Sequence, residues 1–234
     1  MAGARSAQDT GDEKRTSLVD DAYAALKQGI RDSSFAPGYQ ASEGEIALKL
    51  GMSRTPVHEA IIRLQEDGLV RVLPRRGVVI CALAPDDMRE IYDIIIAVEG
   101  RAAELLAALP GAERARVAAD LSGHTETMVE ATKAGDLPAW GRADEAFHRA
   151  LVEEAGNGRM IRIIQTINDQ SHRARMLTLQ MRRKLDRSAL EHRGIIEAIR
   201  EGDASKAQEQ ARQHRLRARN ELLPLLESFG LKHL

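Results

Sequence analysis

Four residues in the second half of the chain have the types and spacing of metal ligands. Asp144 and His148 are four residues apart, so a helix would place them one turn apart on the same face. His192 and His214 flank Gly202-Asp203, ten residues before it and eleven after it. At about 1.5 Å per residue, both histidines would lie roughly 15–16 Å from this turn on antiparallel helices, where they can converge. Three imidazoles and one carboxylate suit zinc, nickel, manganese or iron, with one or two positions left for a ligand or water.

The spacing leaves other interpretations open. Histidines on helices are often polar groups that are satisfied by a partner side chain. A helical metalloenzyme is another alternative, because a histidine-rich site could activate water. However, the sequence contains neither an H-E-x-x-H motif nor a His-Asp dipeptide. Glu145 and His148 form a single E-x-x-H, whereas di-iron bundles need two together with further glutamates.

These four residues require helices to position them, and the sequence predicts an all-helical bundle of about six. The breaks are Pro110-Gly111, Gly135-Asp136, Gly156-Asn157, a basic stretch before Asp186, and Gly202-Asp203. Frequent Ala, Leu, Ile, Arg and Glu agree with helices, and no segment here has the pattern of a strand. The expected helices span residues 85–109, 112–134, 137–155, 158–182, 187–201 and 203–228.

A second pattern, over residues 42–80, predicts a winged helix-turn-helix. Ser42 and Glu45 form an S-x-x-E capping box, and Gly51 supplies the turn after the first helix. Thr55-Pro56 is expected to begin the second helix with a capping hydroxyl and a proline. Two β-rich segments, 70–73 and 78–82, then flank an arginine-rich tip. The second helix of this motif lies in the DNA major groove.

Composition sets the limits of this interpretation. The 234 residues carry a net charge of −1, and residues 1–83 contain 11 basic against 11 acidic side chains. The charge for DNA is therefore local, at Arg54, Arg71, Arg75 and Arg76. A single cysteine excludes an internal disulfide and suits a reducing cytoplasm, and no apolar run suggests a signal peptide or a membrane span. The expected organisation is a disordered tail over 1–15, a DNA-binding domain over 16–83 and a helical domain over 84–234.

The segment SRTPVHEAIIRLQEDGLV, followed by an RRG wing, resembles the GntR family of bacterial transcription regulators. The resemblance implies operator contacts by the start of the recognition helix and by the wing. The corresponding residues are Arg54, Thr55, Pro56, His58, Arg75, Arg76 and Gly77. This chain departs from the family at two positions, because Gly44 and His58 stand where arginines are common. The departures predict an unusual operator sequence or weaker binding to the DNA backbone.

The second half resembles the FCD effector domain of the FadR subfamily, through DEAFHRALVEEAGN, EHRGIIEAIREGDASKA and a histidine on the last helix. In metal-binding members the ligands are an Asp, the His four residues later and two later histidines. The resemblance thus implies the ligands Asp144, His148, His192 and His214, and six helices imply the VanR-like branch. The family's arginine that clamps an effector carboxylate is replaced by Ile95. Arg101, Arg173 and Arg175 are the candidates to substitute for it.

Together these patterns predict a homodimeric, ligand-responsive transcription regulator in the cytoplasm. It would repress a catabolic operon by binding a near-palindromic operator on double-stranded DNA, and a small carboxylate bound at the metal would release it. Besides the metalloenzyme, the alternative is a DNA-binding protein without an effector. Ligand-dependent release from the operator would separate these possibilities.

Overall fold

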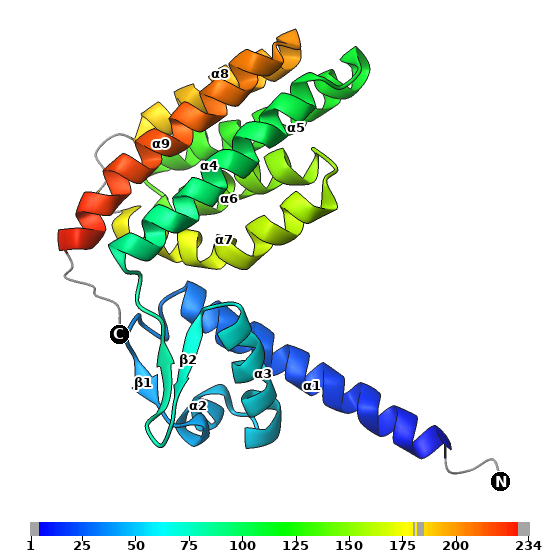
Figure 1. Cartoon of the computed structure of the whole chain (residues 1–234), viewed down its shortest axis with the longest axis vertical. Coiled ribbons are helices and arrows are strands. Elements are labelled where there is room, and N and C mark those ends of the chain that lie inside the picture. The colour runs from blue at the N-terminus through cyan, green and yellow to red at the C-terminus, as the bar shows by residue number, and fades with distance from the viewer. Residues whose placement is uncertain (1–4, 180, 182–184, 229–234) are drawn as a thin grey trace. The chain divides into compact units, whose positions relative to one another are not determined.

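The structure, a computed structural model, describes residues 5–179, 181 and 185–228. The chain divides into two compact units between Ala82 and Leu83, against an expected boundary after residue 83. Each unit is drawn in Figure 1 and is considered by itself below.

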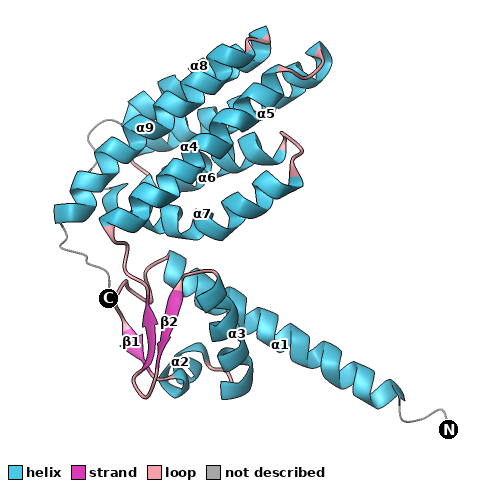
Figure 2. Ribbon diagram, in the orientation of Figure 1, coloured by secondary structure: helices cyan, strands magenta, loops and turns pink. Residues whose placement is uncertain are grey.

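The N-terminal unit is a winged helix-turn-helix, as the sequence predicts. Its elements are α1 (Arg5–Arg31), β1 (Gln40–Ala41), α2 (Glu43–Leu50), α3 (Arg54–Glu66), β2 (Val70–Leu73) and β3 (Gly77–Ile80). The strands form an antiparallel sheet in the order β1-β3-β2 (Figure 2). Apolar side chains of α1, α2, α3 and the sheet share one core, which fixes α3 in the unit.

The ends of α2 agree with the predicted signals, whereas the start of α3 does not. The Ser42–Glu45 capping box is present, and Gly51 ends α2 with a left-handed φ of 66°. The expectation that Thr55 caps α3 is wrong, because α3 begins one residue earlier with Ser53 at its N-cap. Pro56 therefore lies at the third helical position, where its missing N–H removes no intrahelical bond.

The structure contains a helix, α1, that the sequence analysis missed. Val19, Ala22, Leu26 and Ile30 are buried at helical spacing, and α1 packs against α3. α1 begins at Arg5, within the segment 1–15 that was expected to be a disordered tail, and residues 1–4 lie outside the described residues. Once a packed segment has formed a helix, each further residue extends it at little cost in free energy.

The C-terminal unit consists, over its described residues, of the six predicted helices. They are α4 (Pro85–Ala107), α5 (Gly111–Ala134), α6 (Leu137–Glu153), α7 (Gly158–Leu179), α8 (Leu185–Glu201) and α9 (Ala204–Ser228). The observed ends lie within a few residues of the expected ones. The expected end of α7 at residue 182 falls outside the described residues. No helix in the described ranges is long and apolar enough to cross a membrane.

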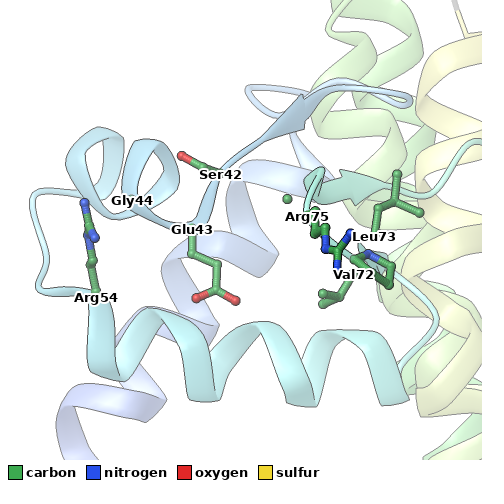
Figure 3. A pocket seen from close by; sticks show the side chains of 9 residues that line it. Ser42, Glu43, Gly44, Arg54, Val72, Leu73 and Arg75 are labelled. Carbon is green, nitrogen blue, oxygen red and sulfur yellow. The ribbon is translucent and has the colours of Figure 1, made fainter.

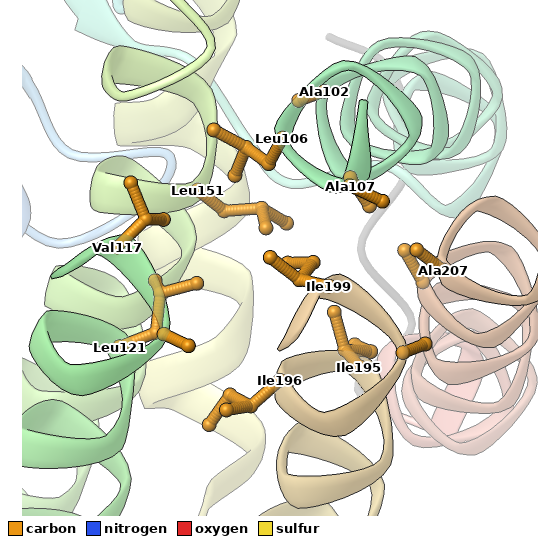
Figure 4. Packing of buried hydrophobic residues seen from close by; sticks show 14 of the residues in the cluster. Ala102, Leu106, Ala107, Val117, Leu121, Leu151, Ile195, Ile196, Ile199 and Ala207 are labelled. Atoms are coloured by element: carbon orange, nitrogen blue, oxygen red, sulfur yellow. The ribbon is translucent and has the colours of Figure 1, made fainter. Parts of the chain in front are cut away.

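An aliphatic core holds these helices in place around the candidate metal ligands. Side chains of α4, α5, α6, α8 and α9 form one buried cluster, which includes Leu106, Leu121, Leu151 and Ile195 (Figure 4). Burying a side chain of this size stabilises the fold by about 1.5–3 kcal/mol. The ligand-bearing α6, α8 and α9 therefore have positions fixed by packing rather than by the polar residues themselves.

Candidate functional site

The four predicted metal ligands converge in the interior of the C-terminal unit. The Nε2 atom of His214 lies 3.2 Å from that of His148 and 3.3 Å from that of His192. An Asp144 carboxylate oxygen, Oδ1, lies 3.6 Å from His148 Nε2 and 3.8 Å from His192 Nε2. The potential ligand atoms of the three histidines all lie within 4.8 Å of one another. All four side chains are buried, so they face one another rather than solvent.

Two of the imidazoles are oriented by buried or half-buried carboxylates. His148 Nδ1 lies 3.0 Å from Glu99 Oε2, and His214 Nδ1 lies 2.8 Å from Glu191 Oε2. Ionised carboxylates only accept hydrogen bonds, so each Nδ1 carries the proton and donates it. In the neutral form of each ring, Nε2 then carries a lone pair, which points to the centre of the cluster. A carboxylate behind the imidazole is the usual support of a metal-ligating histidine.

This arrangement fits a metal ion better than it fits a hydrogen-bonded histidine cluster. With Nδ1 donating, the Nε2 lone pairs of His148 and His214 face each other at 3.2 Å with no proton between them. A cation between the rings would satisfy both. Tetrahedral ligands at about 2.0–2.1 Å from zinc are separated by about 3.3–3.4 Å, close to the observed separations.

The ionisation states also suit a metal. Burial lowers the pKa of His192 well below its ordinary value, and burial lowers the pKa of His214 to about 4 despite its hydrogen bond with Glu191. Burial alone would raise the pKa of Asp144, but His148 and Arg175 hold it well below its ordinary value. Neutral imidazoles and an ionised carboxylate are the forms in which these groups bind metals.

The sequence analysis missed Glu99, which links the cluster to a buried ion pair. Arg215 donates two hydrogen bonds of 2.6 Å to Glu99, one from Nε and one from Nη2. Both side chains are almost fully buried. Burial would raise the pKa of Glu99, but the charge of Arg215 and the contact with His148 lower it overall. The sequence feature that could have indicated Glu99 is an acidic residue on the apolar face of α4, four residues after Ile95.

Glu191 is a second supporting carboxylate that was missed. It accepts from His214 and also from Arg217, whose Nε lies 2.7 Å from both carboxylate oxygens. Burial opposes its ionisation, yet His214 and Arg217 lower the pKa of Glu191 to about 2. Its place directly before His192 in the sequence gave no indication that it supports His214.

The three candidate effector arginines occupy different environments. Arg175 is buried on α7, and its Nε lies 3.7 Å from Asp144 Oδ2. Within the described residues its buried Nη2 has no hydrogen-bond partner. Arg173 is also buried on α7, whereas Arg101 is exposed on α4 and pairs with Glu104 at 2.7 Å. Arg175 therefore contacts the quartet through Asp144.

The candidate DNA-contacting residues are mostly exposed on the N-terminal unit. Arg54, Thr55 and His58 lie on the solvent side of α3. Pro56, which was expected at the DNA surface, is instead buried with the apolar face of that helix. Pro56 thus belongs to the buried side of α3, together with Val57.

The wing carries its arginines on a tightly constrained hairpin. Arg75 and Arg76 are exposed at the tip between β2 and β3. Arg75 has a φ of 63° and Gly77 a φ of 88°. A Cβ at Gly77 would collide with the backbone of Ala41 in β1, so only glycine fits there.

Both halves of the chain match known protein families. Residues 18–80 match the gntR family of bacterial regulatory proteins, and residues 90–217 match the FCD domain. An HTH-type transcriptional regulator in the TAR-I ttuE-ttuC' intergenic region of Agrobacterium vitis is 57% identical over 134 residues. This match covers 57% of the chain and 78% of that relative. The HTH-type transcriptional repressor GlaR of Escherichia coli is 26% identical over 204 residues, which cover 84% of the chain and 91% of GlaR.

A solved structure shows the same fold. A GntR transcriptional regulator from Rhodococcus sp. RHA1 superposes with a TM-score of 0.74 at 22% identity, covering 89% of this chain and 98% of that one. The matched family and these relatives are transcription regulators, which rules out the metalloenzyme alternative. The chain is therefore a DNA-binding transcription regulator that belongs to the gntR family and carries a C-terminal FCD domain.

Proposed function

We propose that this regulator represses a catabolic operon and is released by a small carboxylate bound at a metal held by Asp144, His148, His192 and His214. The observation that carries the proposal is the meeting of four ligand-type side chains in one buried centre, with Nδ1 of two histidines held by carboxylates. When bound, a zinc, nickel, manganese or iron ion would supply a Lewis-acidic position for an effector oxygen. The relative GlaR, itself named a repressor, supports the direction of regulation.

Arg175 is the residue proposed to bind the effector carboxylate. It stands next to the Asp144 oxygen that faces away from His148 and His192, and its Nη2 is a buried donor without a partner in the described residues. A buried donor left unsatisfied costs free energy, which a carboxylate would recover. Arg175 would thereby take the role of the family arginine that is Ile95 in this chain.

A chain of contacts connects this centre to the helix that follows the DNA-binding unit. His148 contacts Glu99 on α4, and α4 begins at Pro85, shortly after β3 ends at Ile80. An effector that shifts α6 or α7 would therefore act on α4. Coupling between two sites is typically about 1–3 kcal/mol, or about 5–150-fold in operator affinity.

Operator release tests the proposal directly. The metal-loaded protein should lose affinity for an operator, selected from random duplex DNA, on titration with at least one of a panel of small mono- and dicarboxylates. The variant Arg175→Met should keep its metal and its operator affinity but lose this response, whereas Arg101→Met, altered on the exposed side of α4, should respond normally. Unchanged operator affinity and unchanged melting temperature with every acid would favour a regulator without an effector.

Operator binding should depend on Arg54 and on the wing. Arg54→Ala should weaken binding by about 1–3 kcal/mol if the guanidinium contacts a guanine edge, and Arg76→Ala should weaken it through the wing. Arg63→Ala is the matched control, because Arg63 lies at the other end of α3 and pairs with Asp20 of α1. Gel-shift titrations of the three variants give the result. Wild-type affinity in both Arg54→Ala and Arg76→Ala would contradict the proposed operator contacts.

The regulator is also proposed to act as a homodimer in the cytoplasm. Its mass in sedimentation should be near twice 25.8 kDa. Footprinting should show two half-sites about one helical turn apart, because a two-fold dimer presents two recognition helices to a near-palindromic operator. A monomer that protects one half-site would exclude this assembly.

A further inference from the structure

A contact between a glutamate and a histidine on the solvent side of the helix-turn-helix joins its two helices. His58 Nδ1 on α3 lies 2.9 Å from Glu43 Oε1 and 3.1 Å from Glu43 Oε2 on α2. The side chains are 55% and 33% exposed, respectively. Pairs this exposed contribute little to stability, so changes at this pair should leave the fold intact.

Gly44, next to Glu43, leaves the space that Arg54 occupies. A Cβ at Gly44 would lie 2.9 Å from Arg54 Nη2 and 3.2 Å from Cζ. Figure 3 shows the Arg54 side chain beside Gly44, with the Glu43 carboxylate directed from α2 towards α3. Any larger residue at position 44 would displace the guanidinium of Arg54.

Glu43 and Arg54 line one groove together with the wing. The groove has a volume of about 420 Å³ and includes Gly44, Arg75 and Gly77. A carboxylate between two arginines of a DNA-binding surface would repel phosphates, so Glu43 is unsuited to binding the DNA backbone. A carboxylate can instead accept a hydrogen bond from the N4 amino group of cytosine in the major groove.

We propose that Glu43, held by His58, selects a cytosine in each operator half-site, and that Gly44 keeps Arg54 in position to contact the neighbouring base. This inference rests on the proposed role of α3 in operator recognition. His58 holds the carboxylate in place from the opposite helix. Gly44 and His58 stand where arginines are usual, and the Glu43–His58 pair beside them would give this surface a different base preference.

Selection from random duplex DNA, followed by sequencing, tests the inference and does not require a known operator. Glu43→Gln should replace the cytosine preference by adenine, because a glutamine side chain pairs with adenine N6 and N7. Glu43→Ala should lower the cytosine preference at that position about five-fold or more and leave the other positions unchanged. Glu66→Gln, at the exposed far end of α3, is the control and should keep the wild-type profile.

Gly44→Ala provides an independent test, since alanine has a higher helix propensity than glycine. This variant should be at least as stable as the wild type yet show a weaker preference at the base read by Arg54. Wild-type base preferences in both Glu43→Gln and Glu43→Ala would overturn the inference. If Arg54→Ala also bound normally, the proposed role of α3 would fail as well. If Arg54→Ala instead lost operator binding as expected, only the proposed role of Glu43 would fail, and the role of α3 would stand.

Discussion

Replacing Arg215 by methionine is expected to lower the free energy of unfolding of the C-terminal unit by about 3–5 kcal/mol. The substitution leaves the Glu99 carboxyl group buried without its cationic partner, and His148 is its remaining partner among the contacts described above. Urea unfolding of the metal-free, full-length protein measures the effect. Trp140 is the sole tryptophan and is buried in this unit, so its fluorescence follows the unfolding of this unit.

A matched control lies one turn further along α9. Arg219 pairs with Asp93 of α4 at 2.9 Å, but Arg219 is only partly buried and Asp93 is exposed. Arg219→Met should therefore change stability by less than about 1 kcal/mol. Equal losses of unfolding free energy in Arg215→Met and Arg219→Met would contradict the expectation that a buried ion pair matters more to stability than an exposed one.

The double variant Glu99→Leu/Arg215→Met separates stability from metal binding. Removing both charges leaves no unpaired ion, so most of the lost stability should return. His148 would nevertheless lack its acceptor, and metal affinity should fall about 10–100-fold. The pKa of Glu99 is lowered by folding, so the contribution of the pair is present above the ordinary glutamate pKa and is lost as the pH falls below it. Measurements at pH 7 therefore contain the whole effect.

Helix geometry relates the predicted ligands only within two pairs, and the resemblance to the FCD domain implied that all four form one site. Asp144 and His148 share one helical face by their spacing, and His192 and His214 have equal depth on either side of a turn. The meeting of the two pairs depends on which faces of α6, α8 and α9 pack together, and spacing alone does not determine this. The same reasoning placed the six C-terminal helices close to their observed bounds.

The supporting residues could not be predicted in this way, because they depend on packing between distant helices. Glu99 and Arg215 are 116 residues apart and meet because α4 packs against α9. The contact between Arg175 and Asp144 similarly requires α6 and α7 to pack together. By contrast, the stripe from Val19 to Ile30 was visible in the sequence, and α1 was missed because the first recognised capping signal was Ser42.

Purified protein is expected to carry about one transition-metal ion per chain, and the double variant His192→Ala/His214→Ala is expected to carry none. The double change removes two of the three imidazoles and leaves Asp144 and His148, too few ligands for tight binding. Elemental analysis measures the content. Metal at 100 times its dissociation constant should raise the free energy of unfolding of the wild type by about 2.7 kcal/mol but should not raise that of the variant. Trp140 fluorescence during urea unfolding measures this difference.

The double variant should also lose the effector response and keep the operator affinity of the metal-free protein, since the recognition helix belongs to the other unit. His124→Ala is the control, because His124 lies on α5, is partly exposed and approaches Asp120 rather than the quartet. This variant should retain both metal and response. The site would be excluded if metal-free wild type could not be reloaded with zinc, nickel, manganese or iron, or if the double histidine variant kept its full metal content. Loss of metal in His124→Ala would likewise mean that the ion is bound elsewhere.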